Sequence, residues 1–158
     1  MWIDHLVSVF YEVPVSSARP RFNKHTGRAY LPAKSANEVT RIKNLIKKRM
    51  KEQFVRQIPK HVPVSVVLHF VHKKPQNQKK STERLPKVTR PDIDNLCKTY
   101  LDAATKAQLW VDDSQVSKLV CEDYYAATDE DPHVIFKASY WLDTKQPKPA
   151  WLEFDPDL

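Results

Sequence analysis

Two carboxylates and one ammonium group lie within a single short stretch of this sequence. Asp92 and Asp94 stand where a helix should begin, because Pro91 disfavours helical backbone at the residue before it. Lys98 comes four residues after Asp94, so the two side chains share one face of that helix. Mg²⁺ prefers carboxylate oxygens and water and is usually shared with substrate phosphates, and a nearby lysine can neutralise charge that develops on such a phosphate. The pattern therefore predicts a metal site for chemistry on phosphodiesters.

A purely structural explanation is open for the same residues. An aspartate at the start of a helix often caps it and complements its dipole. Asp94 and Lys98 would then form a surface ion pair that stabilises the fold by only about a few tenths of a kcal/mol. Capping accounts for one aspartate, but it leaves the second one and the basic residues nearby unexplained.

A second pair of carboxylates, Asp112 and Asp113, follows the same predicted helix. An Asp-Asp-Ser turn is common in loops and indicates no chemistry by itself. In this sequence the helix leads the chain away from Asp92, and a strand that returns along the sheet could bring the turn back toward it. This position makes the turn a candidate part of the same site.

The sequence that contains both aspartate pairs resembles the RusA family of Holliday junction resolvases, found in phages and prophages. The resemblance rests on Asp-x-Asp-Asn-x-x-Lys followed by Asp-Asp-x-Gln-Val, with Asp113 lying 21 positions after Asp92. It implies that Asp92, Asp94 and Asp113 are metal ligands. It also implies an essential charge role for Lys98 and makes Asp112 an additional candidate ligand.

The same resemblance implies the reaction, the cofactor and the assembly. It points to a homodimeric endonuclease that uses Mg²⁺, with Mn²⁺ as an alternative ion. Such an enzyme binds four-way DNA junctions and resolves them by paired symmetric nicks, in DNA recombination and repair or in phage DNA processing. Two alternatives stay open at this point: a less selective nuclease that acts on flaps or forks, and a basic DNA-binding protein without catalytic activity.

An α+β domain is expected to position these residues. Apolar residues with a period of two, or in short continuous runs, predict strands at about 3–13, 62–71, 115–125 and 133–141, and helical spacing predicts helices at 35–54 and 94–108. The second strand is apolar on both faces, so we expect it at the centre of the sheet. The order of elements predicts one α/β-like domain, a mixed sheet of about four strands with two main helices packed on it. We assign residues 1–142 to this domain and residues 143–158 to an extended C-terminal tail of unknown partner.

Positive charge is in excess and is concentrated in loops. Lys and Arg outnumber Asp and Glu by 26 to 19, which gives a net charge of +7 and favours a nucleic-acid partner. Residues 73–90 form a basic loop, and long loops in compact domains are usually functional or disordered. We expect phosphate contacts from this loop and from the loop at 16–32, through Arg19, Arg21, Lys73, Lys74, Lys79, Lys80, Arg84, Lys87 and Arg90.

Composition excludes several other classes of protein. A single glycine excludes the glycine-rich phosphate loops, so any phosphate must be bound by side chains and metal. The two cysteines, Cys97 and Cys121, suit neither a disulfide framework nor a paired-cysteine zinc site, and we expect reduced, mostly buried thiols. Neither a signal peptide nor a run long enough to span a membrane is evident. We therefore expect a cytoplasmic protein of a bacterial or phage-infected cell.

Overall fold

The sheet of this protein is mixed and has five strands. A computed structural model describes residues 1–17, 21–30 and 32–152, which form one α+β domain. The strand order is β1-β7-β4-β6-β5. The strands are β1 (Trp2–Phe10), β4 (Val64–His72), β5 (Leu85–Pro86), β6 (Val116–Tyr125) and β7 (His133–Trp141). β4 and β6 pair in parallel and all other neighbours are antiparallel, which confirms the mixed sheet.

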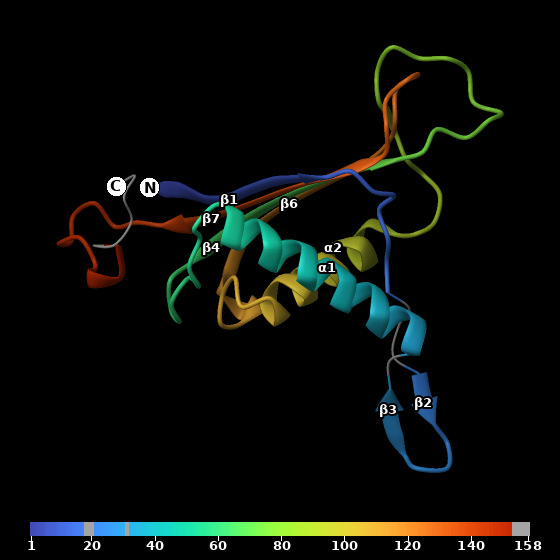
Figure 1. The fold of residues 1–158 in the computed structure, drawn as a ribbon. Coiled ribbons are helices and arrows are strands. Elements are labelled where there is room, and N and C mark those ends of the chain that lie inside the picture. The colour runs from blue at the N-terminus through green and yellow to red at the C-terminus, as the bar shows by residue number, and fades with distance from the viewer. Residues whose placement is uncertain (18–20, 31, 153–158) are drawn as a thin grey trace.

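The four long strands were all expected, and three short ones were not. β4 lies between β7 and β6, as its apolar residues on both faces predicted. β5 has only two residues, and β2 (Arg21–Asn23) and β3 (Arg28–Tyr30) have three each, which is too short to show a period of two. β2 and β3 form a separate hairpin that projects from the body beyond the start of the first helix (Figure 1).

Two helices, α1 (Ala33–Glu52) and α2 (Ile93–Lys106), cover one face of the sheet (Figure 1). Each presents an apolar stripe to the sheet, formed by Val39, Ile42 and Ile46 in α1 and by Leu96, Tyr100 and Ala103 in α2. These side chains pack against the inward row of β4, which consists of Val64, Val66, Leu68 and Phe70, all fully buried. Within the described residues, neither helix combines the length and apolar character needed to cross a membrane.

The segment after β7 folds back onto the domain. The sequence suggested an extended tail from residue 143, but residues Ala150–Leu152 form a short 3₁₀ helix and Leu152 is 1% exposed within the core. The ring of Trp151 lies 5.0 Å from that of Tyr140, centroid to centroid. Apolar packing thus holds this segment, which corrects the expectation up to residue 152. Residues 153–158 lie outside the described part of the chain.

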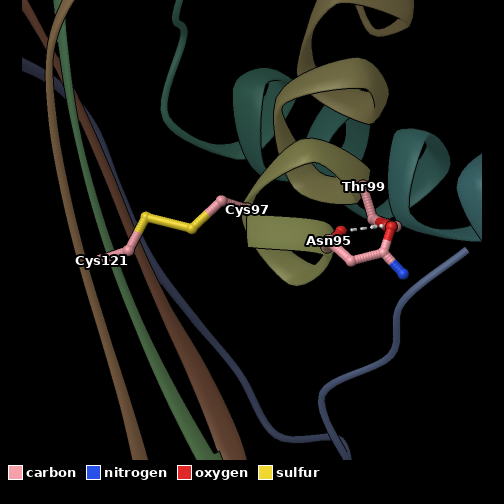
Figure 2. Close-up of a disulfide and its surroundings, with 4 residues drawn as sticks. All are labelled: Asn95, Cys97, Thr99 and Cys121. Carbon is pink, nitrogen blue, oxygen red and sulfur yellow. Dashed lines mark hydrogen bonds between the residues drawn. A yellow bond between two sulfur atoms is a disulfide. The ribbon is translucent and has the colours of Figure 1, made fainter. Parts of the chain in front are cut away.

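The two cysteines are joined, which corrects the expectation of reduced thiols. Cys97 projects from α2 toward the sheet and forms a disulfide with Cys121 of β6, across a Cα–Cα distance of 6.9 Å (Figure 2). The sequence alone did not reveal that the side of α2 that carries Cys97 packs on β6. The bond links the helix that starts at Asp92 to the strand that follows Asp113.

Candidate active site

Asp92 occupies the N-cap position of α2, yet its side chain does not cap the helix. Its backbone is extended (φ −71°, ψ 145°), and no side-chain hydrogen bond to the first helical turn is present. The carboxylate is exposed and takes part in none of the hydrogen bonds or ion pairs among the described residues. Capping therefore does not explain Asp92, and its carboxylate is available to a group outside the protein.

The first turns of α2 present a charged row to solvent. Asp94, Lys98 and Asp102 are spaced by four residues and so lie above one another on one helix face. Asp94 lies in the first turn, where its charge also suits the helix dipole. The Asp94–Lys98 ion pair of the purely structural explanation is not among the ion pairs found within the described residues. Both side chains are exposed, and neither forms a hydrogen bond or ion pair with the described residues.

The turn that carries Asp112 and Asp113 is held in place by Gln115. This side chain is 9% exposed, and its Oε1 accepts hydrogen bonds from the backbone N–H groups of Val111 and Asp112 at 2.8 and 3.0 Å. Its Nε2 donates to the carbonyl oxygens of Pro59 and Val62 at 2.8 and 3.1 Å. A buried amide with four partners fixes the turn against the loop before β4.

Within this turn the two aspartates have different surroundings. Asp112 caps the 3₁₀ helix Asp113–Gln115, because its Oδ1 accepts a hydrogen bond from the backbone N–H of Ser114 at 2.8 Å. That bond lowers the pKa of Asp112. Partial burial raises the pKa of the Asp113 carboxyl, and the negative charges of Asp112 and Asp102 raise it further, whereas Lys98 opposes them. Asp113 therefore lies in a negative field that a bound cation would relieve.

One pocket of about 430 Å³ brings Asp94, Lys98 and Asp113 together. Asp102 lines it too, and its remaining walls are mostly apolar, with Leu101, Leu119 and the disulfide among them. The helix α2 and the Asp112–Asp113 turn thus lie next to each other, as we expected from a strand that returns along the sheet. The sequence analysis missed Asp102, although its spacing of four residues from Lys98 was a signal that could have identified it.

Asp92 does not line the pocket of Asp94 but lines two further pockets next to it. One, of about 650 Å³, also involves Ser16, Arg90 and Asn95. The other, of about 520 Å³, runs along residues 86–89 and 121–124 and shares Ile93 and Cys121 with the pocket of Asp94. Among the described residues, no group of three or more His, Cys, Asp or Glu side chains is assembled for an ion. The three aspartates therefore border one continuous surface without closing into a cage.

Asn95 and Thr99 hold the beginning of the basic loop at residues 16–32. They lie on the side of α2 away from the disulfide (Figure 2). The Asn95 side-chain amide donates to the carbonyl oxygen of Ser17 at 2.9 Å, and the Thr99 hydroxyl accepts from the Ser17 backbone N–H at 2.9 Å. The same hydroxyl donates to the Asn95 carbonyl at 2.8 Å. These bonds fix residue 17 against α2, and the preceding Ser16 lines a pocket with Asp92. This contact gives the asparagine of the Asp-x-Asp-Asn sequence a structural role.

The basic residues expected to contact DNA fall into three groups. Exposed side chains are those of Arg21 on the projecting hairpin, Lys73, Lys79 and Lys80 in the long loop, and Arg90 beside Asp92. Partly engaged side chains are those of Lys74, whose Nζ donates to the Gln78 carbonyl at 2.7 Å, and Arg84, which pairs with Glu130 at 2.9 Å. Arg19 lies outside the described residues.

Lys87 belongs to none of these groups, because its ammonium is buried and already has a partner in the protein. Its side chain is 3% exposed, and its ammonium lies 3.3 Å from the carboxylate of Asp123. A phosphate on a DNA backbone cannot reach a buried ammonium that already has a partner. The sequence did not reveal this burial, because Asp123 lies 36 residues further along the chain.

Comparison with known proteins adds one finding. The family model of the endodeoxyribonuclease RusA matches residues 12–135. No curated protein shows significant similarity to the chain. The matched range contains the whole of α2, the Asp112–Asp113 turn and the three adjoining pockets.

Proposed function

The chain belongs to the RusA family of endodeoxyribonucleases, enzymes that resolve crossover junctions in DNA, and we propose that Asp92, Asp94 and Asp113 hold its catalytic metal. One observation carries the proposal. Asp92 and Asp94 stand at the start of α2 without a hydrogen bond or ion pair to the described residues. Asp94 lines one pocket with Lys98 and Asp113, and Asp92 lines the pocket beside it. Unpartnered carboxylates at the position of a family motif are what a metal site requires.

The donor set fits Mg²⁺, with Mn²⁺ as an alternative. Mg²⁺ keeps several waters and is commonly bound by one or two carboxylates together with substrate phosphates, so a closed cage of protein ligands is not needed. The ligating side chains are exposed and can turn toward a shared ion when DNA arrives. Asp112 is an additional candidate ligand, although one of its oxygens already accepts the Ser114 N–H.

Each charged group has a defined task in this proposal. Asp92, Asp94 and Asp113 would hold a Mg²⁺ ion, which would supply Lewis-acid assistance to the scissile phosphate and activation of a water nucleophile. The ammonium of Lys98 lies beside the same phosphate and neutralises the charge that grows on its oxygens. The exposed cations Arg21, Lys73, Lys79, Lys80 and Arg90 contact the phosphates of the DNA arms, with Arg19, Lys74 and Arg84 as further candidates.

We propose a homodimer that makes paired nicks in a four-way junction. A junction presents two equivalent strands, and a two-fold dimer offers two equivalent sites. The face of the sheet opposite the helices supports this assembly, because neither helix covers it (Figure 1). Val7 of β1 lies between the buried Leu6 and Ser8 and is 48% exposed, so an apolar side chain there is available for contact with a second chain. Residues 1–142 would form the catalytic domain, acting in recombination and repair or in phage DNA processing in the cytoplasm.

The proposal is tested by comparing substrates. Fluorescent four-way junction, flap and linear duplex are incubated with the protein in Mg²⁺ or in EDTA and separated on denaturing gels. We expect Mg²⁺-dependent nicks at symmetric positions in the junction and little cleavage of the duplex. Equal cleavage of flap and junction would favour a less selective nuclease, and binding of all three without cleavage would favour a non-catalytic DNA-binding protein.

A further inference from the structure

We infer that Lys87 is a positioning residue that fixes the chain segment leading into Asp92. The inference rests on the proposed function, because it concerns where one proposed metal ligand is placed. The basic character of its loop had suggested that Lys87 contacts DNA, whereas the inference gives this lysine a structural role.

The ammonium of Lys87 is surrounded by acceptors from its own segment and from the sheet. It donates to the carbonyl oxygen of Thr89, to that of Pro91 at 2.9 Å, and to Oδ2 of Asp123 at 3.3 Å. An ammonium has three N–H donors, so these contacts use all of them. Pro91 immediately precedes Asp92, and the lysine therefore ties the backbone at the candidate ligand to β6.

Asp123 is itself held by the central strands. Its side chain is 8% exposed, and its Oδ1 lies 2.7 Å from Nε2 of His72 at the end of β4. The backbone N–H of Lys87 also donates to the Asp123 carbonyl at 3.0 Å. The cluster formed by His72, Lys87 and Asp123 thus links the parallel pair β4–β6 to residues 87–91. Burying charged groups costs desolvation free energy, and only well-placed partners offset this cost. The contacts of the cluster must therefore keep a defined geometry.

The segment has a second, more superficial attachment that serves as a control. The hydroxyl groups of Thr89 and Tyr125 lie 2.6 Å apart at the exposed surface. This bond holds the middle of the segment and does not involve the Pro91 carbonyl. Its removal by Tyr125→Phe should loosen residue 89 and leave the backbone at Asp92 in place.

The test removes both buried charges together. Lys87→Met alone would leave the Asp123 carboxylate buried without its cation, which is strongly destabilising. The double variant Lys87→Met with Asp123→Asn keeps a hydrogen-bonding partner for His72 and removes both the ammonium and the carboxylate. Circular dichroism and thermal unfolding establish that it is folded, and Tyr125→Phe is measured beside it.

Hydrogen–deuterium exchange is the first measurement, because it does not depend on activity. The reporting amide is the Leu96 N–H, which donates to the carbonyl oxygen of Asp92 at 3.1 Å and so depends on where the Asp92 backbone lies. We expect its exchange in the folded double variant to be at least about tenfold faster than in the wild type, with unchanged protection in the body of α2. Tyr125→Phe should leave exchange at Leu96 as in the wild type. Unchanged exchange at Leu96 in the double variant would overturn the inference, whether or not the protein cleaves DNA.

The metal dependence of cleavage is the second measurement. Partners that orient a metal ligand typically affect metal affinity or activity by about 10- to 100-fold. We expect the Mg²⁺ concentration for half-maximal junction cleavage to rise by at least about tenfold, with much of the maximal rate recovered at saturating Mg²⁺. If the double variant keeps the Mg²⁺ dependence of the wild type, the inference about Lys87 is wrong. The proposed function would stand, because the wild-type protein would still need a metal ion to cleave the junction.

A second variant decides the question if the double variant does not fold. Lys87→Arg keeps a cation beside Asp123, but its planar guanidinium cannot place three donors around one nitrogen as an ammonium does. We expect the same changes in exchange and in Mg²⁺ dependence, smaller in size. If Lys87→Arg behaves as the wild type in both measurements, the inference is wrong.

Discussion

At the scale of single residues, this protein separates aspartates that hold the fold from aspartates that are available for chemistry. Asp112 accepts the Ser114 N–H and caps a 3₁₀ helix, whereas its neighbour Asp113 faces a pocket with Lys98. Asp92 stands at a helix N-cap and makes no cap hydrogen bond. A capping role would have been the ordinary use of that position. The hydrogen bonds, rather than the residue types, distinguish the two uses.

Lys98 provides the sharpest prediction at this scale. Lys98→Ala should lower the single-turnover cleavage rate by about a hundredfold or more, the range seen when a donor that stabilises a transition state is lost. Thermal unfolding should change little, since Lys98 forms no ion pair within the described residues. Lys106→Ala, an exposed lysine in the last turn of the same helix, is the matched control. Equal cleavage rates in the two variants would remove Lys98 from the active site.

At the scale of secondary-structure elements, α2 distributes its sides among several partners. One side packs in the core, one bonds to Cys121 of β6, one holds Ser17, and one presents Asp94 and Lys98. The sequence predicted the apolar stripe and the charged row, because both follow helical spacing. It did not predict the disulfide or the burial of Lys87, because each depends on a strand distant in sequence. Local patterns thus located the candidate site, and tertiary contacts determined which side chains are available in it.

The long basic loop gives an element-scale prediction about DNA binding. Changing the exposed Lys73, Lys79 and Lys80 to Gln should flatten the plot of log affinity against log salt by about 0.9 per lost phosphate contact. Lys145→Gln with Lys148→Gln is the control, because these exposed lysines lie after β7, at the other end of the molecule (Figure 1). A slope that stays at the wild-type value would show that the loop is solvated in the complex.

The attachment of this loop predicts a dependence of stability on pH. Hydrogen bonds from Arg84 lower the pKa of Glu130, which lies between β6 and β7. A lowered pKa means that the stabilisation is complete above the ordinary glutamate pKa and is lost as the pH falls through the lowered value. Glu130→Gln should therefore melt below the wild type at neutral pH, and the two melting temperatures should converge in acid. A difference that persists at low pH would assign the effect to packing.

At the scale of the whole molecule, the charges and the open sheet face agree with the proposed symmetric DNA enzyme. The helices cover one face of the sheet and leave the opposite face uncovered (Figure 1). Val7 lies between the buried Leu6 and Ser8 of β1 and is 48% exposed. The projecting hairpin and the long basic loop both extend from the body, where they can reach DNA arms (Figure 1). In the proposed mechanism each chain contributes one set of Asp92, Asp94 and Asp113, which would suffice for one nick. Two linked nicks would then require two chains.

A mixed dimer tests this requirement. Wild-type and Asp94→Asn subunits are combined and the heterodimer is isolated through two different affinity tags. One intact site should nick one strand of a junction and seldom release resolved duplexes, which native and denaturing gels distinguish. Sedimentation of the untagged protein should give about twice the 18.4 kDa mass of the chain. Full resolution by the mixed dimer, or a monomer on junction DNA, would contradict paired cleavage.

The most direct test of the carboxylate site compares cleavage with binding in the same aspartate variants. Asp92→Asn, Asp94→Asn and Asp113→Asn are each assayed for junction cleavage in Mg²⁺ and for junction affinity in EDTA, with the remote Asp143→Asn as the control. We predict that each of the three abolishes cleavage while affinity stays within about tenfold of the wild type or rises, because a negative charge beside phosphate is lost. A variant that cleaves at the wild-type rate would remove that residue from the site, and three such variants would refute the account.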